Sequence, residues 1–537
     1  MPDAPSLPDP VRRIMAGGVT VTMADGVRDR ALDSAGRTAV VDGERTLTFA
    51  AVHARSNRLA QTLLGAGLVP GDPVAVLLGN RLEYPEVAAA LAKAGLPMVP
   101  LGIRQTGPEV AWIVGHSGAR ALIVQGERAE EVLDALSASA DRITLVLTVG
   151  APGPGRAYEE ALATAPDRDP LVRVGGEDVF CIQYTSGTTG RPKGALLTHR
   201  GRALTALLSA HEWGLGAGRT SLAVAPMSHG AGFMFGFAPV LTGGTVVMLP
   251  RWDPARMLSL AEEHRVQSVF LVPTHAQTLR ALGENAPARH RLDALDTLYF
   301  NAAALPVQLK EWVLDAFPRC GVHELYGSTE GGVVTDLRPV DARRKAGSVG
   351  RAWYLTEVRV VDDEGRAVAP GEPGELFSNS PFLMAGYFDD PGATAACTAP
   401  DGALSVGDVA TMDDEGYVTI VDRKKDLIVS GGLNVYPREV EEALLHHPAV
   451  AECAVAGTAD PVWGERVTAF VVWAPGAVPA AVEDLADFLR PRLAGYKLPR
   501  RLEAVDRLPR NSAGKVLKRE LRDGPAPLRP KQDPSTA

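Results

Sequence analysis

Apolar and polar positions along the first two thirds of the chain alternate between a helical and a strand-like period. Residues 49–68, "FAAVHARSNRLAQTLLGAGL", place apolar side chains three and four positions apart and end on Gly-Leu, which predicts a helix. The run "DPVAVLLG" (72–79) predicts a buried strand, and "YPEVAAALAKAGLPMVPL" (84–101) repeats helix and then strand. "GARALIV" (118–124) continues the series. This alternation predicts an α/β fold with buried parallel strands.

The pattern changes between Thr356 and Ile420. "EVRVVDDEGRAVAPGEPGELFSN" (357–379) has strand-like runs joined by Asp-Glu-Gly and Pro-Gly turns, which predict hairpins. Beyond "VDRKKD" (421–426), four segments follow one another as helix, strand, strand and helix: "REVEEALLHHPAV", "AECAVAG", "RVTAFVVW" and "VEDLADFLRPRL". We therefore expect an N-terminal domain at 1–424, a small C-terminal domain at 425–523, and a Pro-rich, disordered tail at 524–537.

Composition narrows the class of protein. The chain has 537 residues and a net charge of −9, so an electrostatic attraction to nucleic acid is not expected. None of the four cysteines forms a CxxC pair, which favours reduced thiols over zinc ligands. No apolar run approaches the roughly 18 residues that span a bilayer, and the N-terminus lacks a signal-peptide core. We expect a cytoplasmic protein, with the choice between monomer and homodimer left open.

The stretch "YTSGTTGRPKG" (184–194) has the glycines, hydroxyls and lysine of a phosphate-binding loop. A Walker loop requires G-x-x-x-x-G-K-[ST] before a helix, but here Pro192 and Gly194 flank Lys193. Strand-like runs on both sides, "VFCIQ" and "ALLT", predict a flexible hairpin loop instead. Lys193 and the first residues of this loop are the candidate phosphate ligands: Thr185, Ser186, Gly187, Thr188 and Thr189.

This eleven-residue string resembles the signature of the adenylate-forming superfamily, which contains acyl-CoA synthetases, nonribosomal adenylation domains and luciferases. The resemblance implies a large N-terminal domain of parallel and mixed sheets flanked by helices, with a β-rich subdomain, and a small mobile α+β C-terminal domain. It also implies the reaction of an acyl- or aryl-CoA synthetase. In that reaction ATP adenylates a carboxylic acid with release of pyrophosphate, and the acyl group then passes from acyl-AMP to the thiol of CoA.

Further motifs occur in the order expected for the family. "LYGSTE" (325–330) looks like its adenine and magnesium motif, which includes Gly327 and Ser328. By that resemblance Tyr326 stacks on adenine, Thr329 contacts the α-phosphate and Glu330 holds Mg²⁺. Glutamate is a suitable hard oxygen ligand for Mg²⁺ beside phosphates.

Three motifs near the C-terminus resemble the family's ribose, hinge and lysine motifs. Asp408 of "SVGD" would bind the ribose hydroxyls, although Val406 departs from the usual pattern. In "VDRKKD", Arg423 would reach the ribose or a phosphate, and Lys425 would be the hinge. Lys515 of "LPRNSAGKVLKREL" (508–521) would enter the site during adenylation. Without the resemblance, the last two stretches read as solvated surface turns.

The second half-reaction implies a rotation of the C-terminal domain about Lys425. The rotated domain would present "SGGLNVYP" (430–437) to the pantetheine arm of CoA. Gly431 and Gly432 permit a close backbone approach there. The same Gly-Gly pair is equally compatible with a plain turn before the helix "PREVEEALL".

Adenylation requires no general base, because a carboxylate with an ordinary pKa near 4 is already ionised at pH 7. The obstacle is the approach of an anion to a polyphosphate. Catalysis should therefore consist of positioning and charge neutralisation. The candidate groups are Lys193, Lys515, Arg423 and a Mg²⁺ ion on Glu330.

"PMSHGAGF" (226–233) resembles the motif that lines the acyl pocket. His229 stands where acyl- and aryl-CoA synthetases commonly carry a catalytic-site histidine, and Phe233 ends the motif. Amino-acid-activating relatives carry an aspartate at the position of Ala231. Because an unpaired ammonium in such a pocket would be costly, α-amino acids are disfavoured as substrates.

"FNAAALP" (300–306) departs from the family, because Asn301 and Ala302 stand where glycines are common. Ala302 and Ala303 would border the nucleotide, and the changed wall makes a long straight acyl tail a less secure expectation. Asn301 is interpreted either as a hydrogen-bonding partner of a substrate substituent or as a cap at a strand end. His275 either lines the pocket or lies with its hydrogen bonds satisfied at the edge.

Two alternatives remain beside the CoA ligase. A stand-alone ligase of specialised metabolism would deliver the adenylate to a carrier-protein thiol or another nucleophile, or would activate nitrite for diazotisation of an aromatic amine. The lack of a long insertion before the hinge favours CoA. A non-catalytic nucleotide-binding protein is disfavoured by intact Glu330, Asp408 and Lys515.

Overall fold

A computed structural model describes residues 21–137, 142–185, 192–510 and 516–522. The chain divides into two compact units. The larger contains residues up to 358 together with 377–406, and the smaller contains 359–376 together with the residues from 407 onward. Both units combine helices and sheets, so the predicted α/β class is confirmed. No helix in the described ranges is both long and apolar enough to cross a bilayer.

A nine-stranded sheet forms one half of the larger unit, in the order β16-β15-β14-β13-β12-β10-β11-β1-β2 within the described residues. Its central strands pair in parallel, for example Val269 with Leu298, while its edges are antiparallel. The strands are β1 (Thr38–Asp42), β2 (Arg45–Thr48), β10 (Thr220–Ala223), β11 (Thr245–Met248), β12 (Ser268–Leu271), β13 (Thr297–Phe300), β14 (Gly321–Ser328), β15 (Gly332–Leu337) and β16 (Arg351–Ala352).

An eight-stranded sheet forms the other half, in the order β19-β9-β8-β4-β3-β5-β6-β7 in the described part of the chain. The strands predicted at 72–79 and 118–124 are confirmed as parallel neighbours, with Val74 opposite Ala121. The strands are β3 (Val74–Leu77), β4 (Met98–Pro100), β5 (Ala121–Gln125), β6 (Leu145–Val149), β7 (Arg156–Ala157), β8 (Val179–Thr185), β9 (Lys193–Thr198) and β19 (Gly386–Tyr387).

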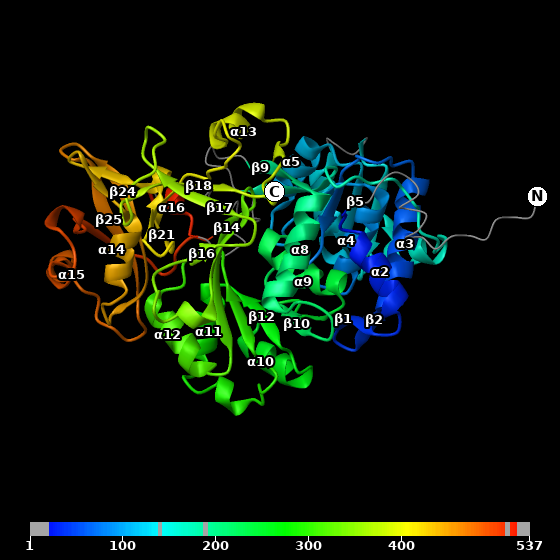
Figure 1. Ribbon diagram of the computed structural model, residues 1–537, viewed down its shortest axis with the longest axis horizontal. Coiled ribbons are helices and arrows are strands. Elements are labelled where there is room, and N and C mark those ends of the chain that lie inside the picture. Colours follow the sequence, from blue (N-terminus) through cyan, green and yellow to red (C-terminus); the bar gives the residue numbers. More distant parts are fainter. Residues whose placement is uncertain (1–20, 138–141, 186–191, 511–515, 523–537) are drawn as a thin grey trace, which may run out of the picture. The chain divides into compact units, whose positions relative to one another are not determined.

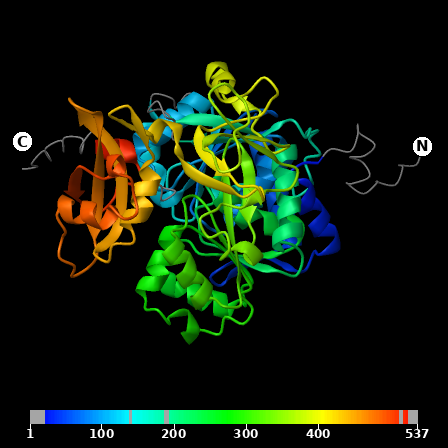
Figure 2. The same ribbon diagram turned by 60° about the vertical axis from the view of Figure 1, so that its left-hand side comes forward.

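Helices cover both sheets, and two of them lie between the sheets. α8 packs against β8 and β9 on one side and against α9 on the other, while α9 packs against β10 and β11 (Figure 1). The green helices α10 to α12 lie together beside the β12–β13 part of the first sheet (Figure 2). The helices are α2 (Asp25–Asp33), α3 (Phe49–Gly65), α4 (Glu83–Ala94), α5 (Gly107–Ser117), α6 (Gly126–Ala135), α7 (Tyr158–Ala163), α8 (His199–Trp213), α9 (Gly230–Thr242), α10 (Pro254–Glu263), α11 (Pro273–Ala281), α12 (Val307–Ala316) and α13 (Pro391–Cys397).

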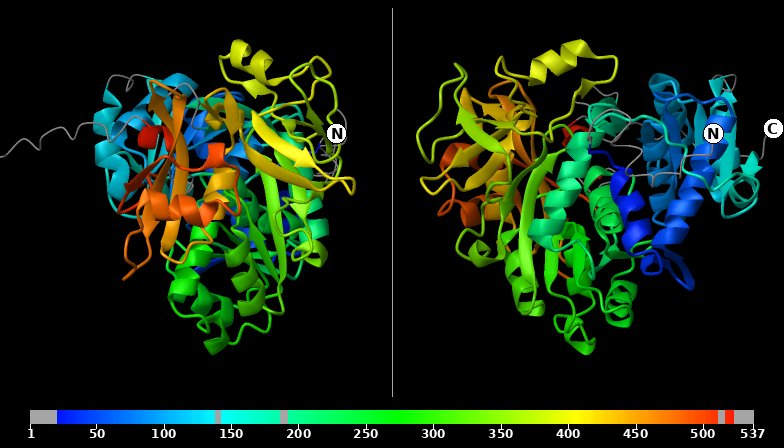
Figure 3. Two further views of the ribbon diagram at one scale, coloured as in Figure 1. Left: turned by 90° about the vertical axis from the view of Figure 1, so that its left-hand side faces the viewer. Right: turned by 45° about the vertical axis from the view of Figure 1, so that its right-hand side comes forward.

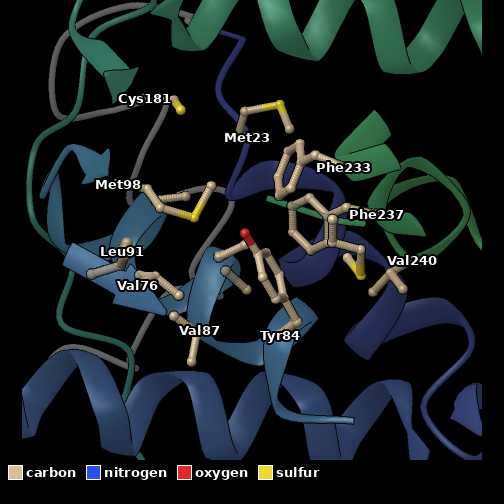
Figure 4. Packing of buried hydrophobic residues seen from close by; sticks show 14 of the residues in the cluster. Met23, Val76, Tyr84, Val87, Leu91, Met98, Cys181, Phe233, Phe237 and Val240 are labelled. Atoms are coloured by element: carbon tan, nitrogen blue, oxygen red, sulfur yellow. The ribbon is translucent and has the colours of Figure 1, made fainter. Parts of the chain in front are cut away.

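The core between the sheets surrounds α4 and α9. All twelve residues of α4 are buried, which accounts for its run of small apolar residues. The three charged residues of α4 are buried as well and are held by ion pairs or hydrogen bonds: Glu83, Glu86 and Lys93. Tyr84 of α4 is fully buried beside Phe233 and Phe237 of α9, and its hydroxyl points into this cluster (Figure 4). The hydrophobic effect of this packing fixes α9, and thereby the loop in front of it.

The smaller unit is built from the predicted hairpins and α+β module. β18 (Gly374–Asn379) pairs with β20 (Asp408–Met412), which pairs with β21 (Val418–Arg423). The long strands β24 and β25 then form an antiparallel pair beside α14 and α15 (Figure 3, left, orange). The remaining elements are β17 (Glu357–Val361), η4 (Lys424–Asp426), β22 (Ile428–Ser430), β23 (Leu433–Val435), α14 (Pro437–Leu444), β24 (Val450–Asp460), β25 (Gly464–Trp473), α15 (Val482–Leu489), η5 (Gly495–Lys497), β26 (Arg501–Ala504) and α16 (Lys518–Arg522).

The division into compact units does not coincide with the predicted domain boundary at 424/425. Residues 359–376 and 407–423 pack with the C-terminal module because β18, β20 and β21 pair with one another. The predicted boundary concerns a rotation, which is a different property from packing density, and it stays a prediction. The tail at 524–537 lies outside the described residues.

Candidate active site

The phosphate-loop motif stands between two antiparallel strands, as predicted. β8 and β9 form a hairpin in which Thr185 lies opposite Lys193 and Tyr184 opposite Gly194. The loop residues Ser186, Gly187, Thr188 and Thr189 lie outside the described residues. The hairpin presents Thr185 and Lys193 at its end, and both side chains are partly exposed.

The "LYGSTE" motif forms a second tight turn, between β14 and β15. A side chain at Gly327 would collide with the backbone oxygen of Gly332, 2.1 Å from the Cβ position, so only glycine allows this close pairing. The Ser328 hydroxyl accepts a hydrogen bond from the Gly331 amide at 2.8 Å and closes the turn. Tyr326 in β14 and Thr329 in the turn are half-buried, and Glu330 is only 8% exposed.

Glu330 joins the two turns. Its Oε1 accepts hydrogen bonds from the Thr185 hydroxyl at 3.3 Å and from the Tyr387 hydroxyl at 2.8 Å. Within the described part of the chain, its Oε2 forms no hydrogen bond or ion pair. A buried carboxylate that is held on one oxygen and available on the other suits a hard cation such as Mg²⁺.

Lys193 lies beside the same tyrosine. Its Nζ is 5.2 Å from the centre of the Tyr387 ring and 3.9 Å from Asp390 Oδ2. Tyr387 was not predicted from the sequence. The two-residue strand that carries it, in "AGYFDD", is too short to show a periodic pattern.

His229 lies in a loop that two buried amides hold in place. Asn80, just after β3, donates to the carbonyl oxygens of Ala223 and Ala225 at 3.2 and 3.0 Å and accepts from the Met227 amide at 2.9 Å. Gln183 of β8 donates to the Ser228 carbonyl at 3.0 Å. His229 is the N-cap residue of α9 and is half-buried. Neither amide was identified from the sequence, because nothing local marks a residue that binds a distant loop.

The imidazole of His229 is held neutral near pH 7. Burial, and secondly the positive charge of Arg104, lower its pKa below the ordinary value. The same two causes lower the pKa of His275 to about 4. Arg104, in the loop after β4, is exposed and makes no ion pair within the described residues. The sequence analysis did not single out Arg104.

The imidazole of His275 contacts other residues of the protein through its ring and through Nδ1. It stacks on Trp252 with ring centres 4.1 Å apart, and its Nδ1 accepts from the Val272 amide at 3.3 Å at the start of α11. These contacts favour the interpretation of a satisfied histidine at the edge of the pocket. Ala231 is partly buried at the start of α9, and the Phe233 ring is 5% exposed and packs on Phe180 and Phe237. A contact of Phe233 or His275 with substrate stays a prediction.

The wall at 301–305 is a strained turn after β13. Ala302 has φ = +75°, a left-handed conformation that costs a residue with a Cβ roughly 1–2 kcal/mol. The Asn301 side chain accepts a hydrogen bond from the amide of Ala302, which favours the cap interpretation, and a contact of Asn301 with a substrate substituent stays a prediction. Ala302 and Ala303 are exposed. Glu324 of β14, paired with Lys310 at 2.5 Å, accepts from the Leu305 amide at 3.4 Å behind this turn.

In the smaller unit, the predicted ribose residues are direct neighbours. Asp408 of β20 lies opposite Arg423 of β21, and Arg423 Nε is 3.1 Å from Asp408 Oδ1. Lys425 follows in η4, where burial lowers the pKa of its ammonium and Arg423 lowers it further. Lys424 forms ion pairs with Asp363 and Glu375, both at 3.1 Å.

Gly431 and Gly432 form the two-residue turn of the hairpin between β22 and β23. Both have positive φ, +59° and +80°, as such hairpin turns require. A Cβ at Gly431 would lie 2.6 Å from the Trp463 ring, so the position is restricted to glycine. The plain-turn interpretation is thus realised, and a role toward CoA stays a prediction. Lys515 lies outside the described residues.

Two family models match successive parts of the chain. The family described as AMP-binding enzyme matches residues 27–388, and the family described as AMP-binding enzyme C-terminal domain matches residues 439–515. Neither match ends at 424/425, so neither fixes the predicted hinge.

Several relatives match nearly the whole chain. The feruloyl-CoA synthase of Amycolatopsis sp is 41% identical over 497 residues, covering 92% of this chain and 97% of the relative. A long-chain fatty-acid–CoA ligase of Mycobacterium tuberculosis is 36% identical over 479 residues, covering 89% and 93%. A 2-succinylbenzoate–CoA ligase of Geobacillus kaustophilus is 35% identical over 506 residues, covering 93% and 98%.

Solved structures agree with these matches. An anthranilate CoA ligase in complex with anthranoyl-AMP superposes with a TM-score of 0.87 at 26% identity, covering 95% of this chain and 98% of the other. ATP-bound MatB from Rhodopseudomonas palustris gives a TM-score of 0.86 at 29% identity, covering 94% and 99%.

Proposed function

The chain belongs to the AMP-binding enzyme family, and we propose that it is an ATP-dependent, AMP-forming acid–CoA ligase. It adenylates a carboxylic acid with release of pyrophosphate and then transfers the acyl group from acyl-AMP to the thiol of CoA. The hydrogen bond between Thr185 and Glu330 carries this proposal. This bond joins the β8–β9 hairpin to the predicted magnesium turn, although Thr185 and Glu330 are 145 positions apart in the sequence.

Adenylation by this site depends on charge and position. The acid attacks as a carboxylate, and the α-phosphate loses pyrophosphate, so no residue needs to remove a proton. Lys193 neutralises the departing phosphates, and Thr329 orients the α-phosphate. Mg²⁺, when bound at Glu330, supplies further neutralisation of the polyphosphate. Asp408 accepts hydrogen bonds from the ribose hydroxyls, and Arg423, already 3.1 Å away, orients that carboxylate.

Two variants test the roles assigned to the lysines. Lys515→Ala should abolish pyrophosphate exchange and leave thioester formation from supplied acyl-AMP largely intact. Lys425→Pro should spare adenylation and block thioester formation. Equal loss of both half-reactions in Lys515→Ala would remove the role assigned to Lys515. Unchanged thioester formation in Lys425→Pro would remove the hinge role, and with it the domain rotation and the CoA role of Gly431 and Gly432.

The substrate pocket is matched to an acid without an ammonium group. His229 and His275 are neutral near pH 7, and Ala231 offers no carboxylate to an amine. We therefore expect an aryl acid or a medium-to-long acyl acid. The 41% identical relative acts on ferulate by its name, which places hydroxycinnamates first among candidates.

The decisive experiment is a panel of acids with the purified chain, ATP, Mg²⁺ and CoA, followed by mass spectrometry. The panel contains hydroxycinnamates, benzoates and fatty acids, each with and without nitrite. An acyl-CoA thioester with equimolar AMP is expected for at least one acid. Formation of AMP with no thioester, or of a diazo product only with nitrite, would refute the CoA assignment.

A second acceptor has one specific observation in its favour. A fatty acid–[acyl-carrier-protein] ligase of Streptomyces coeruleorubidus is 36% identical over 496 residues, covering 90% of this chain and 93% of the relative. The alternative is therefore a ligase that delivers the same adenylate to a carrier-protein thiol. Replacing CoA by a holo carrier protein in the panel distinguishes the two acceptors.

The reactants ATP and CoA support a cytoplasmic location. Cell fractionation with an antibody against the chain would test it, and recovery in the membrane or culture medium would contradict it.

A further inference from the structure

Tyr387 contacts two charged groups near the end of the β8–β9 hairpin, the Glu330 carboxylate and the Lys193 ammonium. It lies on β19, which adds to the phosphate hairpin as an edge strand with Tyr387 opposite Ala195 of β9. Its amide donates to Thr394 Oγ1 of α13 at 2.8 Å, and α13 lies close to β9 (Figure 1). The backbone at Tyr387 is therefore held by β9 and by α13.

The hydroxyl of Tyr387 orients the Glu330 carboxylate. It donates to Oε1 at 2.8 Å, a shorter contact than the 3.3 Å from Thr185. Because Glu330 makes no ion pair within the described residues, these two hydroxyls are what fixes its rotation there. Among the residues that the structure describes, Oε2 has no such contact and is available to a cation, and partners of this kind commonly set the affinity of a metal ligand.

The ring of Tyr387 positions Lys193 by a separate interaction. The ammonium lies 5.2 Å from the ring centre, within the range of a cation–π attraction. On its other side Lys193 faces Asp390 at 3.9 Å. The two contacts keep the long, flexible lysine side chain at the end of the hairpin, where the departing phosphates would lie.

We infer that Tyr387 is a positioning residue with two separable parts: its hydroxyl sets Glu330 for Mg²⁺, and its ring sets Lys193 for the phosphates. The inference rests on the proposed function, because it presupposes that Mg²⁺ and ATP bind at this site. A purely structural tyrosine would need only its ring, which packs against the core cluster between the sheets. The bond from its hydroxyl to Glu330 is not required for that packing.

Two substitutions separate the parts. Tyr387→Phe removes the hydroxyl and keeps the ring, whereas Tyr387→Leu removes both. A matched control is Tyr354→Phe, because the Tyr354 hydroxyl also donates to a carboxylate, Glu212 at 2.9 Å, beside the cation Arg338 at 6.0 Å from its ring. The control removes the same chemical group at a site with no assigned role in catalysis.

Calorimetric titration with ATP, in Mg²⁺ and in EDTA, is the readout that does not depend on turnover. For Tyr387→Phe we expect affinity in Mg²⁺ to fall about 10–100-fold, with affinity in EDTA within about twofold of wild type. Tyr387→Leu should weaken binding under both conditions. Electron paramagnetic resonance of Mn²⁺, titrated into the ATP complex, should show the same loss of metal affinity for Tyr387→Phe and none for Tyr354→Phe.

The outcomes separate the inference from the function on which it rests. Wild-type affinity of Tyr387→Phe for Mg²⁺-ATP would overturn the inference, as would an equal loss in Mg²⁺ and EDTA. Absence of ATP binding by the wild-type chain would instead refute the proposed function. Should Tyr387→Leu fail to fold, Tyr387→Phe alone decides, because it retains the packing ring and its fold can be compared with Tyr354→Phe by circular dichroism.

Discussion

At the scale of single residues, the positive charge of Arg104 lowers the pKa values of two histidines, and in the described part of the chain Arg104 makes no ion pair. A nearby cation opposes protonation, so the pKa values of His229 and His275 lie below the ordinary value. In Arg104→Gln both pKa values should rise, though not fully, because burial remains the larger cause. Nuclear magnetic resonance of labelled histidine, followed from pH 4 to 8, measures this. Arg256→Gln, which removes an exposed arginine of α10, should leave both titrations unchanged; unaltered titrations in Arg104→Gln would contradict the assignment.

The residues that the sequence identified are those whose motifs are local. Thr185 and Glu330 were predicted separately from two short strings, and the structure brings them to 3.3 Å. Tyr387 and Asn80 escaped detection because their importance lies in contacts with residues at least 57 positions away. No spacing rule encodes such a contact. The sequence is compatible with two roles for Asn301. The structure favours the role of a cap, because the Asn301 side chain accepts a hydrogen bond from the Ala302 amide.

At the scale of elements, Asn80 fixes the loop from Ala223 to Met227 that leads to His229. It satisfies backbone groups of the loop while itself buried, at 4% exposure. Asn80→Ala removes the partner of the Ala225 carbonyl and of the Met227 amide, at a cost of about 1–3 kcal/mol, and releases the loop, whereas the Ala223 carbonyl still accepts from the Leu249 amide. We expect kcat/KM for the acid to fall at least about tenfold, while KM for ATP changes little.

A control for Asn80→Ala should lose stability without affecting the loop. Asn57→Ala meets this need, because Asn57 is a buried amide on α3 that bonds Lys93 and the Asp167 carbonyl. Steady-state kinetics with each substrate varied in turn make the comparison. A similar fall in kcat/KM for both variants would mean that the effect comes from stability alone.

Behind the pocket wall, a buried ion pair joins α12 to β14. Lys310 is fully buried and lies 2.5 Å from Glu324, which holds the Leu305 amide of the wall. Lys310→Met leaves a buried carboxylate without its partner and should lower the free energy of unfolding by about 3–5 kcal/mol. The double variant Lys310→Met/Glu324→Leu should recover much of that loss. Urea unfolding of both variants measures it, and equal losses would argue against charge burial as the cause.

Strands and helices were predicted well from the sequence, whereas the pairing of strands that are distant in the sequence was not. The runs at 72–79 and 118–124 were predicted as strands and are adjacent parallel strands. By contrast, no local pattern in the sequence indicates that β9 pairs with a further strand, β19, formed by residues 386–387. Long-range pairing depends on how loops return the chain, and loop lengths and compositions constrain that only weakly.

At the scale of the whole molecule, the sequence predicted two parts but not their packing boundary. The hinge motif at Arg423 and Lys425 suggested a division there, while compactness places residues 359–376 and 407–423 with the C-terminal part. The cause is the pairing of Gly374 with Ala410, which are 36 positions apart in the sequence. The predicted hinge lies inside the smaller compact unit. The ion pairs of Lys424 with Asp363 and Glu375 are local to that unit, so they are distinct from the contacts that a rotation would break.

Acid stability is a property of the whole chain, and its direction follows from three histidines in separate elements. His53, His199 and His275 have pKa values of about 4, with burial as the leading cause. In the unfolded chain the value is about 6.5, so the unfolded state binds more protons in between. The free energy of unfolding should therefore fall as pH drops from about 6.5 toward 4, by up to about 1.4 kcal/mol per pH unit for each histidine. Glu83 and Asp169, with pKa values of about 2, contribute only at lower pH.

His199 offers the clearest test of this acid sensitivity, because it is 1% exposed and its Nδ1 accepts the Met23 amide at 3.3 Å. Asparagine at this position supplies an acceptor that does not titrate. In His199→Asn the pH dependence of unfolding between 6.5 and 4.5 should become shallower by up to about 1.4 kcal/mol per pH unit. Urea midpoints at several pH values measure the slope, with the exposed His211 at the end of the same helix replaced as the control. An unchanged slope in His199→Asn would show that this imidazole gains its proton equally in the folded and unfolded chains, and the acid sensitivity would then have to reside in other groups.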